Sequence, residues 1–204
     1  NPQGALAQEE LPVQDIDLYR VENLPIIGQA FITKPSLAQC LEWWDAWEVP
    51  DNIRKHSQTV ARSAYFLAVL MRNKGIHVDP ILTHRGGLLH DIDKIETLRQ
   101  HGAHGRVGAA FLTEQGYPAV AEILRDHIMS TILHPNADDR GWEVKLVFFC
   151  DKLVEGEELV LFDERLDALF ERYPHYREAM GRAEGAVWRL SDEICSVLNV
   201  SSHK

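Results

Sequence analysis

Apolar residues recur at the spacing of an α-helix in several segments of the chain. The segment from Asp51 to Lys74 begins with a capping residue and stops before Gly75, where a helix is expected to end. Its apolar stripe consists of Ile53, Val60, Ala64, Leu67 and Met71. His56 fills the vacant position of this stripe, so its side chain is predicted to point inward.

Three further segments place a polar side chain on an apolar stripe. After Pro118, a favourable first residue of a helix, His127 lies on the stripe of Val120, Ile123, Leu124, Ile128 and Thr131. From Trp142 to Val154, Asp151 lies on the stripe of Val144, Val147 and Val154. A helix that starts near His104 puts His104, Val107 and Phe111 on one side. A buried carboxylate is costly unless it is paired or binds a metal, so the position of Asp151 predicts a partner.

The remaining pattern predicts an all-α fold. Residues 1–34 lack a helical period and contain Pro25 and Gly28, which indicates an extended N-terminal arm or short hairpin. Further helices are expected from Pro35 to Trp47, Asp163 to Arg172 and His175 to Leu198, with Leu37, Leu41, Trp44 and Trp47 as the inner face of the first. Loops are expected at Asp93 to Gly105 and Pro135 to Gly141. We therefore expect residues 35–204 to form a single bundle of about eight helices.

One short segment concentrates metal-ligand chemistry. It reads Gly86-Gly87-Leu88-Leu89-His90-Asp91-Ile92-Asp93-Lys94. Imidazole and carboxylate are ligands that first-row metals share, and when they are neighbours one can hold a metal terminally while the other bridges to a second. Such a dipeptide is weak evidence alone, and it gains weight because His or Asp recurs at inward positions elsewhere in the chain.

The ordered set His56, His90-Asp91, His104, His127 and Asp151 resembles the HD-domain superfamily of metal-dependent phosphohydrolases, most closely its HDIG-like bacterial members. The resemblance covers roughly Asp51 to Asp151. It implies that one or two divalent ions (Fe, Mn, Ni, Co or Mg) bind, the first held by His56, His90, Asp91 and Asp151. Asp91 would then bridge to a second ion held by His104 and His127.

Two motifs refine this resemblance. His104-x-x-x-Gly108-Ala109 is similar to the histidine motif of bacterial symmetrical diadenosine tetraphosphate hydrolases. Many relatives carry glycine where this chain has Asp93, a carboxylate that could change the metal preference or pair with Lys94. Lys94 keeps the family's place for a residue that contacts a phosphoryl oxygen or orders the site electrostatically.

Metal ions held by such ligands would support hydrolysis of a phosphate ester by an activated water. Two metals about 3.5 to 4 Å apart can activate a water and clamp a phosphoryl group, so no serine or cysteine nucleophile is needed. Asp91 and Lys94 are the predicted catalytic residues, and Lys94, Arg106 and His134 the predicted substrate-binding residues, with His134 at the rim because Pro135 ends its helix. His101 competes with His104 as a ligand, but only His104 is followed by the spacing of a packed helix.

These features predict a phosphomonoesterase or phosphodiesterase that acts on a small phosphorylated metabolite such as a nucleotide. Two alternatives remain. Some members of the superfamily use the same ligands in a di-iron oxygenase, although the lysine after His-Asp favours hydrolysis. A non-catalytic nucleotide-sensing module is the other, although an intact ligand set argues against it.

Composition limits the classes of molecule that the chain is expected to bind. The chain has 204 residues, 45% of them hydrophobic, which is enough for one sizeable core. A net charge of −10 argues against duplex nucleic acid, while bound metals would still let a small phosphorylated ligand bind. Cys40, Cys150 and Cys195 have no CxxC spacing, which favours reduced thiols and a cytoplasmic protein, and no apolar run predicts a membrane span. The Trp-rich helix is either core or the face of a homodimer.

Overall fold

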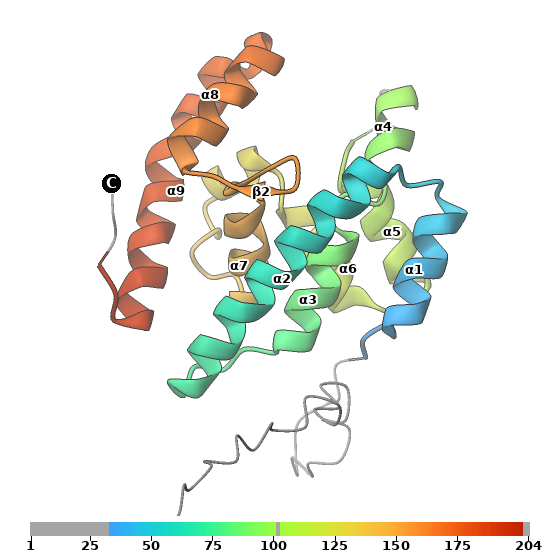
Figure 1. Cartoon of the computed structure of the whole chain (residues 1–204), viewed down its shortest axis with the longest axis horizontal. Coiled ribbons are helices and arrows are strands. Elements are labelled where there is room, and N and C mark those ends of the chain that lie inside the picture. The colour runs from blue at the N-terminus through green and yellow to red at the C-terminus, as the bar shows by residue number, and fades with distance from the viewer. Residues whose placement is uncertain (1–32, 101–102, 202–204) are drawn as a thin grey trace, which may run out of the picture. The chain divides into compact units, whose positions relative to one another are not determined.

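α-Helices are the main secondary structure of the described part of the chain (Figure 1). The structure is a computed structural model, and it describes residues 33–100 and 103–201. The helices are α1 Leu37–Ala46, α2 Asp51–Asn73, α3 Pro80–Leu89, α4 Lys94–Gln100, α5 Arg106–Glu114, α6 Pro118–Asp126, α7 Trp142–Asp151, α8 Phe162–Arg172 and α9 Arg177–Leu198. The predicted all-α fold is therefore confirmed.

Short elements complete the described chain. Two 3₁₀ turns, η2 Met129–Leu133 and η3 Pro174–Tyr176, precede α7 and α9. The strands β1 Val154–Glu155 and β2 Glu158–Leu159 form a small antiparallel hairpin in which Val154 lies opposite Leu159. The predicted arm, residues 1–34, lies outside the described residues except for Thr33 and Lys34, and so does His101.

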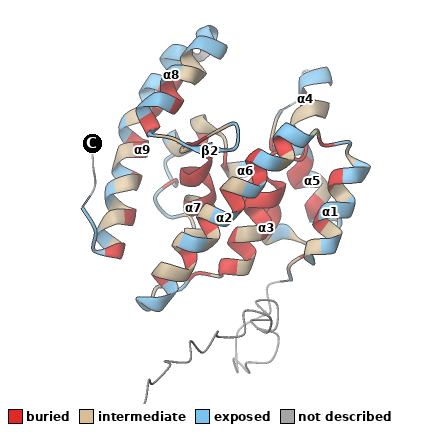
Figure 2. Cartoon of the chain, viewed as in Figure 1, coloured by how far each residue is buried: buried red, intermediate tan, exposed pale blue. Residues whose placement is uncertain are grey.

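Helix α3 lies at the centre of the packing, against α1, α2, α6 and α7. Almost every residue of α3 is buried, as the red ribbon in Figure 2 shows. Glycine makes this possible, because a Cβ on Gly87 would lie 2.6 Å from the Cα of Ala61 on α2, and one on Gly86 would lie 2.5 Å from Cδ1 of Ile123 on α6. The close packing carries the following residues, His90 and Asp91, into the core.

Local chemistry explains where α3 begins. The carboxylate of Asp79 accepts hydrogen bonds from the backbone N–H groups of Ile81 and Leu82, and Pro80 occupies the first turn, where its missing N–H costs nothing. Asp79 is thus the N-cap of α3, and its side chain also forms an ion pair with Lys34.

Several expected helix boundaries were wrong. Helix α6 ends at Asp126 and does not continue to Thr131, because the chain turns into η2. Helix α5 begins at Arg106, after His104, and Val107 is 38% exposed because the small residues Gly108 and Ala109 face inward instead. Helix α7 ends at Asp151, and Val154 begins a strand.

The N-terminal helices differ from expectation in detail. Leu41 is 40% exposed, since Cys40 and Trp44 form the buried side of α1. The indole of Trp44 donates to the carbonyl of Leu88 at 3.1 Å, and Trp43 packs edge-on against Phe111, so these two side chains act in packing.

Helix α4 occupies much of the expected loop after Asp93. None of the helices in the described ranges has the length and apolarity needed to cross a membrane.

Candidate metal centre

Six side chains from distant parts of the sequence meet beside the C-terminal end of α3. They are His56, His90, Asp91, His104, His127 and Asp151. On one side, His56 Nε2 lies 3.0 Å and His90 Nε2 lies 3.6 Å from Oδ1 of Asp151. His56, His90 and Asp151 are all buried, and their ligand atoms are close enough together to hold one metal ion.

Asp91 connects this group to a second one. Its Oδ2 lies 3.6 Å from Nε2 of His90 and 3.9 Å from Nε2 of His56. Its other oxygen, Oδ1, lies 2.8 Å from Nε2 of His104 and 3.6 Å from Nε2 of His127. The two histidines of the second group are 3.2 Å apart, measured between their Nε2 atoms. Each oxygen of Asp91 therefore faces a different ligand group, which is the arrangement of a bridging carboxylate.

Backbone carbonyls set the ring orientation of three of the histidines. Nδ1 of His56 lies 3.0 Å from the carbonyl oxygen of Gly156, and Nδ1 of His90 lies 2.8 Å from that of Gly87. Nδ1 of His127 lies 2.6 Å from the carbonyl oxygen of Leu124. A carbonyl only accepts, so each Nδ1 carries the hydrogen and each Nε2 lone pair is left for a ligand in the cluster.

The residues present fit a divalent metal. Nε2 of His90 is fully buried and has no hydrogen-bond partner among the described residues, although buried polar atoms are nearly always satisfied. His90 and His127 each follow the last residue of a helix, so that the ring turns back to the carbonyl three residues earlier. Imidazole and carboxylate in this number suit Mn, Fe, Co or Ni better than Mg, which prefers oxygen ligands.

His104 is oriented by a side chain instead. It precedes α5, and its Nδ1 donates to Oδ1 of Asp93 at 2.8 Å. Asp93 is completely buried and also accepts from the backbone N–H groups of Gly105 and Gly108. The alternative pairing of Asp93 with Lys94 was wrong, because the Lys94 ammonium lies 2.6 Å from Oδ2 of Asp91.

A second lysine, missed in the sequence, supports the cluster from behind. Lys152 is 5% exposed, and its ammonium donates to Oδ2 of Asp151 and, at 2.9 Å, to the carbonyl of His127. The sequence signal that could have revealed Lys152 is its place directly after Asp151, which was expected to be buried. A lysine there would be buried as well, and a buried ammonium needs an anionic partner. Gly156 was missed as well, because its role rests on a backbone carbonyl that no side-chain pattern reveals.

The charges of the cluster depend strongly on each other. Burial would raise the pKa of Asp91, yet His90, Lys94 and the hydrogen bonds of His104 and His127 hold it well below its usual range. Lys152 does the same for the pKa of Asp151. Burial lowers the pKa of His127 to about 4. Although burial opposes the charged form of His104 too, Asp91 and Asp93 raise its pKa to about 9. Asp91 and Asp151 are thus ionised and can act as anionic ligands.

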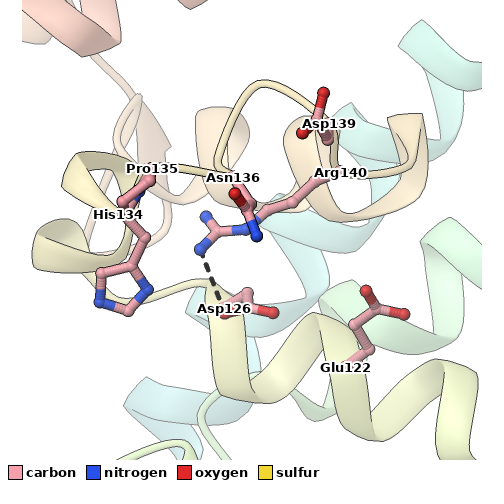
Figure 3. A pocket seen from close by; sticks show the side chains of 7 residues that line it. All are labelled: Glu122, Asp126, His134, Pro135, Asn136, Asp139 and Arg140. Carbon is pink, nitrogen blue, oxygen red and sulfur yellow. Dashed lines mark hydrogen bonds and ion pairs between the residues drawn. The ribbon is translucent and has the colours of Figure 1, made fainter.

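Two predicted substrate residues are exposed at the surface. Arg106 is exposed as the first residue of α5. His134 is exposed after η2 and borders an open hollow of about 530 Å³. Figure 3 shows this hollow, with the guanidinium of Arg140 held by Asp126 at 3.2 Å. None of the six cluster residues lines it. A substrate role for Arg106 or His134 stays a prediction.

Comparison with known proteins agrees with the ligand pattern. The HD domain family model matches residues 53–155, a range that includes all six cluster residues. This chain belongs to the HD domain family. A relative in Methanocaldococcus jannaschii, described as an uncharacterized protein, is 33% identical over 163 residues, covering 72% of this chain and 90% of the relative. No solved structure matches the chain. The resemblance to the HD superfamily is therefore confirmed.

Proposed function

We propose that this HD domain protein is a metal-dependent phosphohydrolase, a phosphomonoesterase or phosphodiesterase that acts on a small phosphorylated metabolite. The observation that carries the proposal is the position of Asp91, whose two oxygens face two groups of histidines while its Oδ2 also accepts from Lys94. Membership of the HD domain family, whose members are generally hydrolases, supports the same reaction class.

The ligand assignment is part of the proposal. His56, His90, Asp151 and Oδ2 of Asp91 would hold one ion, and His104, His127 and Oδ1 of Asp91 a second. When bound, a pair of divalent ions lowers the pKa of a water towards neutrality and offsets the negative charge of a phosphoryl group. The protein's part is to keep both aspartates ionised and all Nε2 atoms directed inward.

Exposure indicates the side from which a substrate would approach. The side chains of Lys94 and His104 are 32% and 28% exposed, whereas those of Asp91 and His90 are 3% and 0% exposed. A substrate phosphate would therefore reach the cluster past Lys94 and His104. The other five proposed ligands, His56, His90, Asp91, His127 and Asp151, are buried behind these two side chains.

Lys94 is suited to meet that phosphate. Burial would lower its pKa, but the Asp91 carboxylate raises it above the ordinary value, with smaller contributions from Asp151 and Tyr173. The ammonium thus stays charged at neutral pH and can donate to a phosphoryl oxygen while it keeps Asp91 in place. Tyr173, 37% exposed, is a further candidate for the rim of the substrate site.

A nucleotide is the substrate class we propose. Its phosphate would meet Lys94, and an aromatic ring such as that of Tyr173 offers a surface on which a base can stack. The net charge of −10 does not oppose this choice, because the local charge of bound ions decides the binding of a small anion.

The test combines metal analysis with activity. Protein purified without chelator should contain a first-row divalent metal and should hydrolyse a member of a panel of nucleotides, sugar phosphates and phosphodiesters. Asp91→Ala should abolish this activity, while Glu178→Ala, which removes a carboxylate that is 88% exposed on α9, should leave it intact. Protein without metal, or full activity in Asp91→Ala, would contradict the proposal. Oxygen consumption that requires iron would favour the oxygenase alternative.

A further inference from the structure

We propose that Asp93 is a positioning residue that fixes His104 for the second metal ion. This inference rests on the proposed metal centre. Three histidines of the cluster donate from Nδ1 to backbone carbonyls, which no substitution can remove directly. His104 differs, because its Nδ1 partner is the side chain of Asp93. The orientation of one ligand therefore depends on one carboxylate.

The hydrogen bond decides which nitrogen of His104 is available. Nδ1 lies 2.8 Å from Oδ1 of Asp93, and Nε2 lies 2.8 Å from Oδ1 of Asp91. Because Asp93 holds the hydrogen on Nδ1, the Nε2 lone pair becomes the ligand atom once a metal replaces the proton on that side. A carboxylate behind a metal-bound imidazole also makes the imidazole more basic and stops the ring from rotating.

Asp93 also holds the segment that carries His104. Its Oδ1 accepts from the N–H of Gly105 at 3.1 Å, and its Oδ2 accepts from the N–H of Gly108 at 2.8 Å. The three donors come from the last residues before α5 and from its first turn. All of the carboxylate's hydrogen bonds to described residues thus go to the His104 side of the cluster, and none goes to His56, His90 or Asp151.

The two glycines let this segment lie against His127. Gly105 has a φ of +79°, and a Cβ there would lie 2.5 Å from the carbonyl oxygen of Leu124 and 3.2 Å from Cε1 of His127. The same Leu124 carbonyl accepts from Nδ1 of His127. A Cβ on Gly108 would lie 3.0 Å from side-chain atoms of Ile92 and Leu124. The segment that Asp93 holds through Gly105 and Gly108 therefore packs directly against His127 and Leu124.

Metal titration of the whole chain tests this role. Metal-free wild type, Asp93→Asn and Asp93→Ala are titrated with Mn²⁺ by calorimetry, and bound ions per chain are counted by elemental analysis. Wild type should bind two ions. Asp93→Ala should keep one ion near wild-type affinity and bind the second about tenfold to a hundredfold more weakly. Asp93→Asn should be intermediate, because its amide oxygen can still accept from His104 while its NH₂ group opposes the N–H of Gly108.

Asp79→Asn is the matched control. Asp79 also accepts two backbone N–H groups at the start of a helix, but it contacts no cluster residue in the described structure. This variant should bind both ions as wild type does, although the cap of α3 is weakened. A second readout is the ¹⁵N spectrum of the zinc-loaded proteins, in which the Nδ1–H signal of His104 should be protected in wild type and exchange rapidly in Asp93→Ala.

Three results would overturn the inference. They are a second ion bound equally tightly by Asp93→Ala, a wild type that takes up a single ion, and an Asp79→Asn variant that loses the second ion to the same extent. Failure of the proposed function is distinguishable from these. If the metal pattern is as expected but no phosphoester is cleaved, the role of Asp93 is supported and the proposed reaction is wrong.

Discussion

Nδ1 of His56 lies 3.0 Å from the carbonyl oxygen of Gly156, a residue 100 positions further along the chain. Gly156 forms the turn of the β1–β2 hairpin, and Thr59 on α2 donates to the neighbouring carbonyl of Glu157 at 3.0 Å. The hairpin is held from its other side, where Glu155 accepts from Arg165 and Arg172 of α8. The C-terminal part of the chain thus contributes to the orientation of His56.

Loss of this connection should weaken the first metal site. In Glu155→Gln the ion pairs to Arg165 and Arg172 are lost, and we expect the free energy of unfolding to fall by about 1 to 2 kcal/mol. Because Gly156 becomes less well held, the affinity for the first ion should fall severalfold. Urea unfolding and metal titration measure the two effects. Glu178→Gln, which breaks an exposed pair with Arg182, should change neither. Equal effects in both variants would contradict the role of the hairpin.

Lys152 should contribute more to stability than a lysine whose carboxylate partner is exposed. Lys152→Met leaves Asp151 buried without its nearest cation, so the free energy of unfolding should fall by about 3 kcal/mol. Lys145→Met is the control, since Lys145 pairs at 2.8 Å with Glu193, a carboxylate that is 42% exposed. Chemical denaturation of the metal-free proteins makes the comparison. A loss no larger than that of the control would show that Asp151 has sufficient other partners.

The metal-free protein should lose stability as the pH rises above neutrality. The pKa of His104 is raised from 6.5 to about 9 in the folded chain, so its contribution is fully present below pH 6.5 and is lost as the pH rises towards 9. Thermal melting between pH 6 and 9.5 should show this loss, and His104→Gln should lack it. A wild type and a variant with parallel profiles would contradict the assignment.

Metal uptake should release a proton from the same residue. Near pH 8 His104 is largely protonated in the metal-free chain, and a metal at Nε2 displaces that proton while Nδ1–H stays on Asp93. Calorimetry in buffers with different ionisation enthalpies counts the released protons. The count for wild type should exceed that for His104→Gln by about one.

Lys94 should affect turnover more than metal content. Lys94→Met removes the ammonium that faces the substrate side, and we expect kcat to fall about a hundredfold, in the range for loss of one charge-stabilising donor. Elemental analysis should still find the metal, because Lys94 is not a ligand. Lys94→Arg should retain part of the activity. Loss of metal together with activity in Lys94→Met would show that the lysine acts by holding Asp91 instead.

Helical periodicity predicted the burial of the cluster residues that lie within helices, and it was less accurate at helix ends. His56 is buried on α2 as its place on the stripe required, and Asp151 is buried at the end of α7 with the partners that burial demanded. His90 and His127 follow the last residues of α3 and α6, where contacts with backbone carbonyls determine the ring orientation. A repeat of apolar residues carries no information about such contacts.

The environment of Asp93 could not be derived from the sequence for a related reason. Its partners Gly105 and Gly108 contribute backbone N–H groups, and glycine gives no side-chain signal of that kind. The substitution of aspartate for the usual glycine of the family was recognisable, but the choice between Lys94 and His104 as its partner depended on the path of the chain through α4. Packing between residues far apart in the sequence determines that His104, and not Lys94, lies beside Asp93.

The segment from Asp93 to His104 begins and ends at the same carboxylate, since Nδ1 of His104 returns to Oδ1 of Asp93. A loop closed at its base in this way can change in length or composition without moving the residues that close it. Helix α4, whose Leu98 is 61% exposed, belongs to this segment. If the proposed function holds, exchange of residues in α4 beyond Lys94 should change the substrate preference while His104, at the far end of the loop, keeps its place.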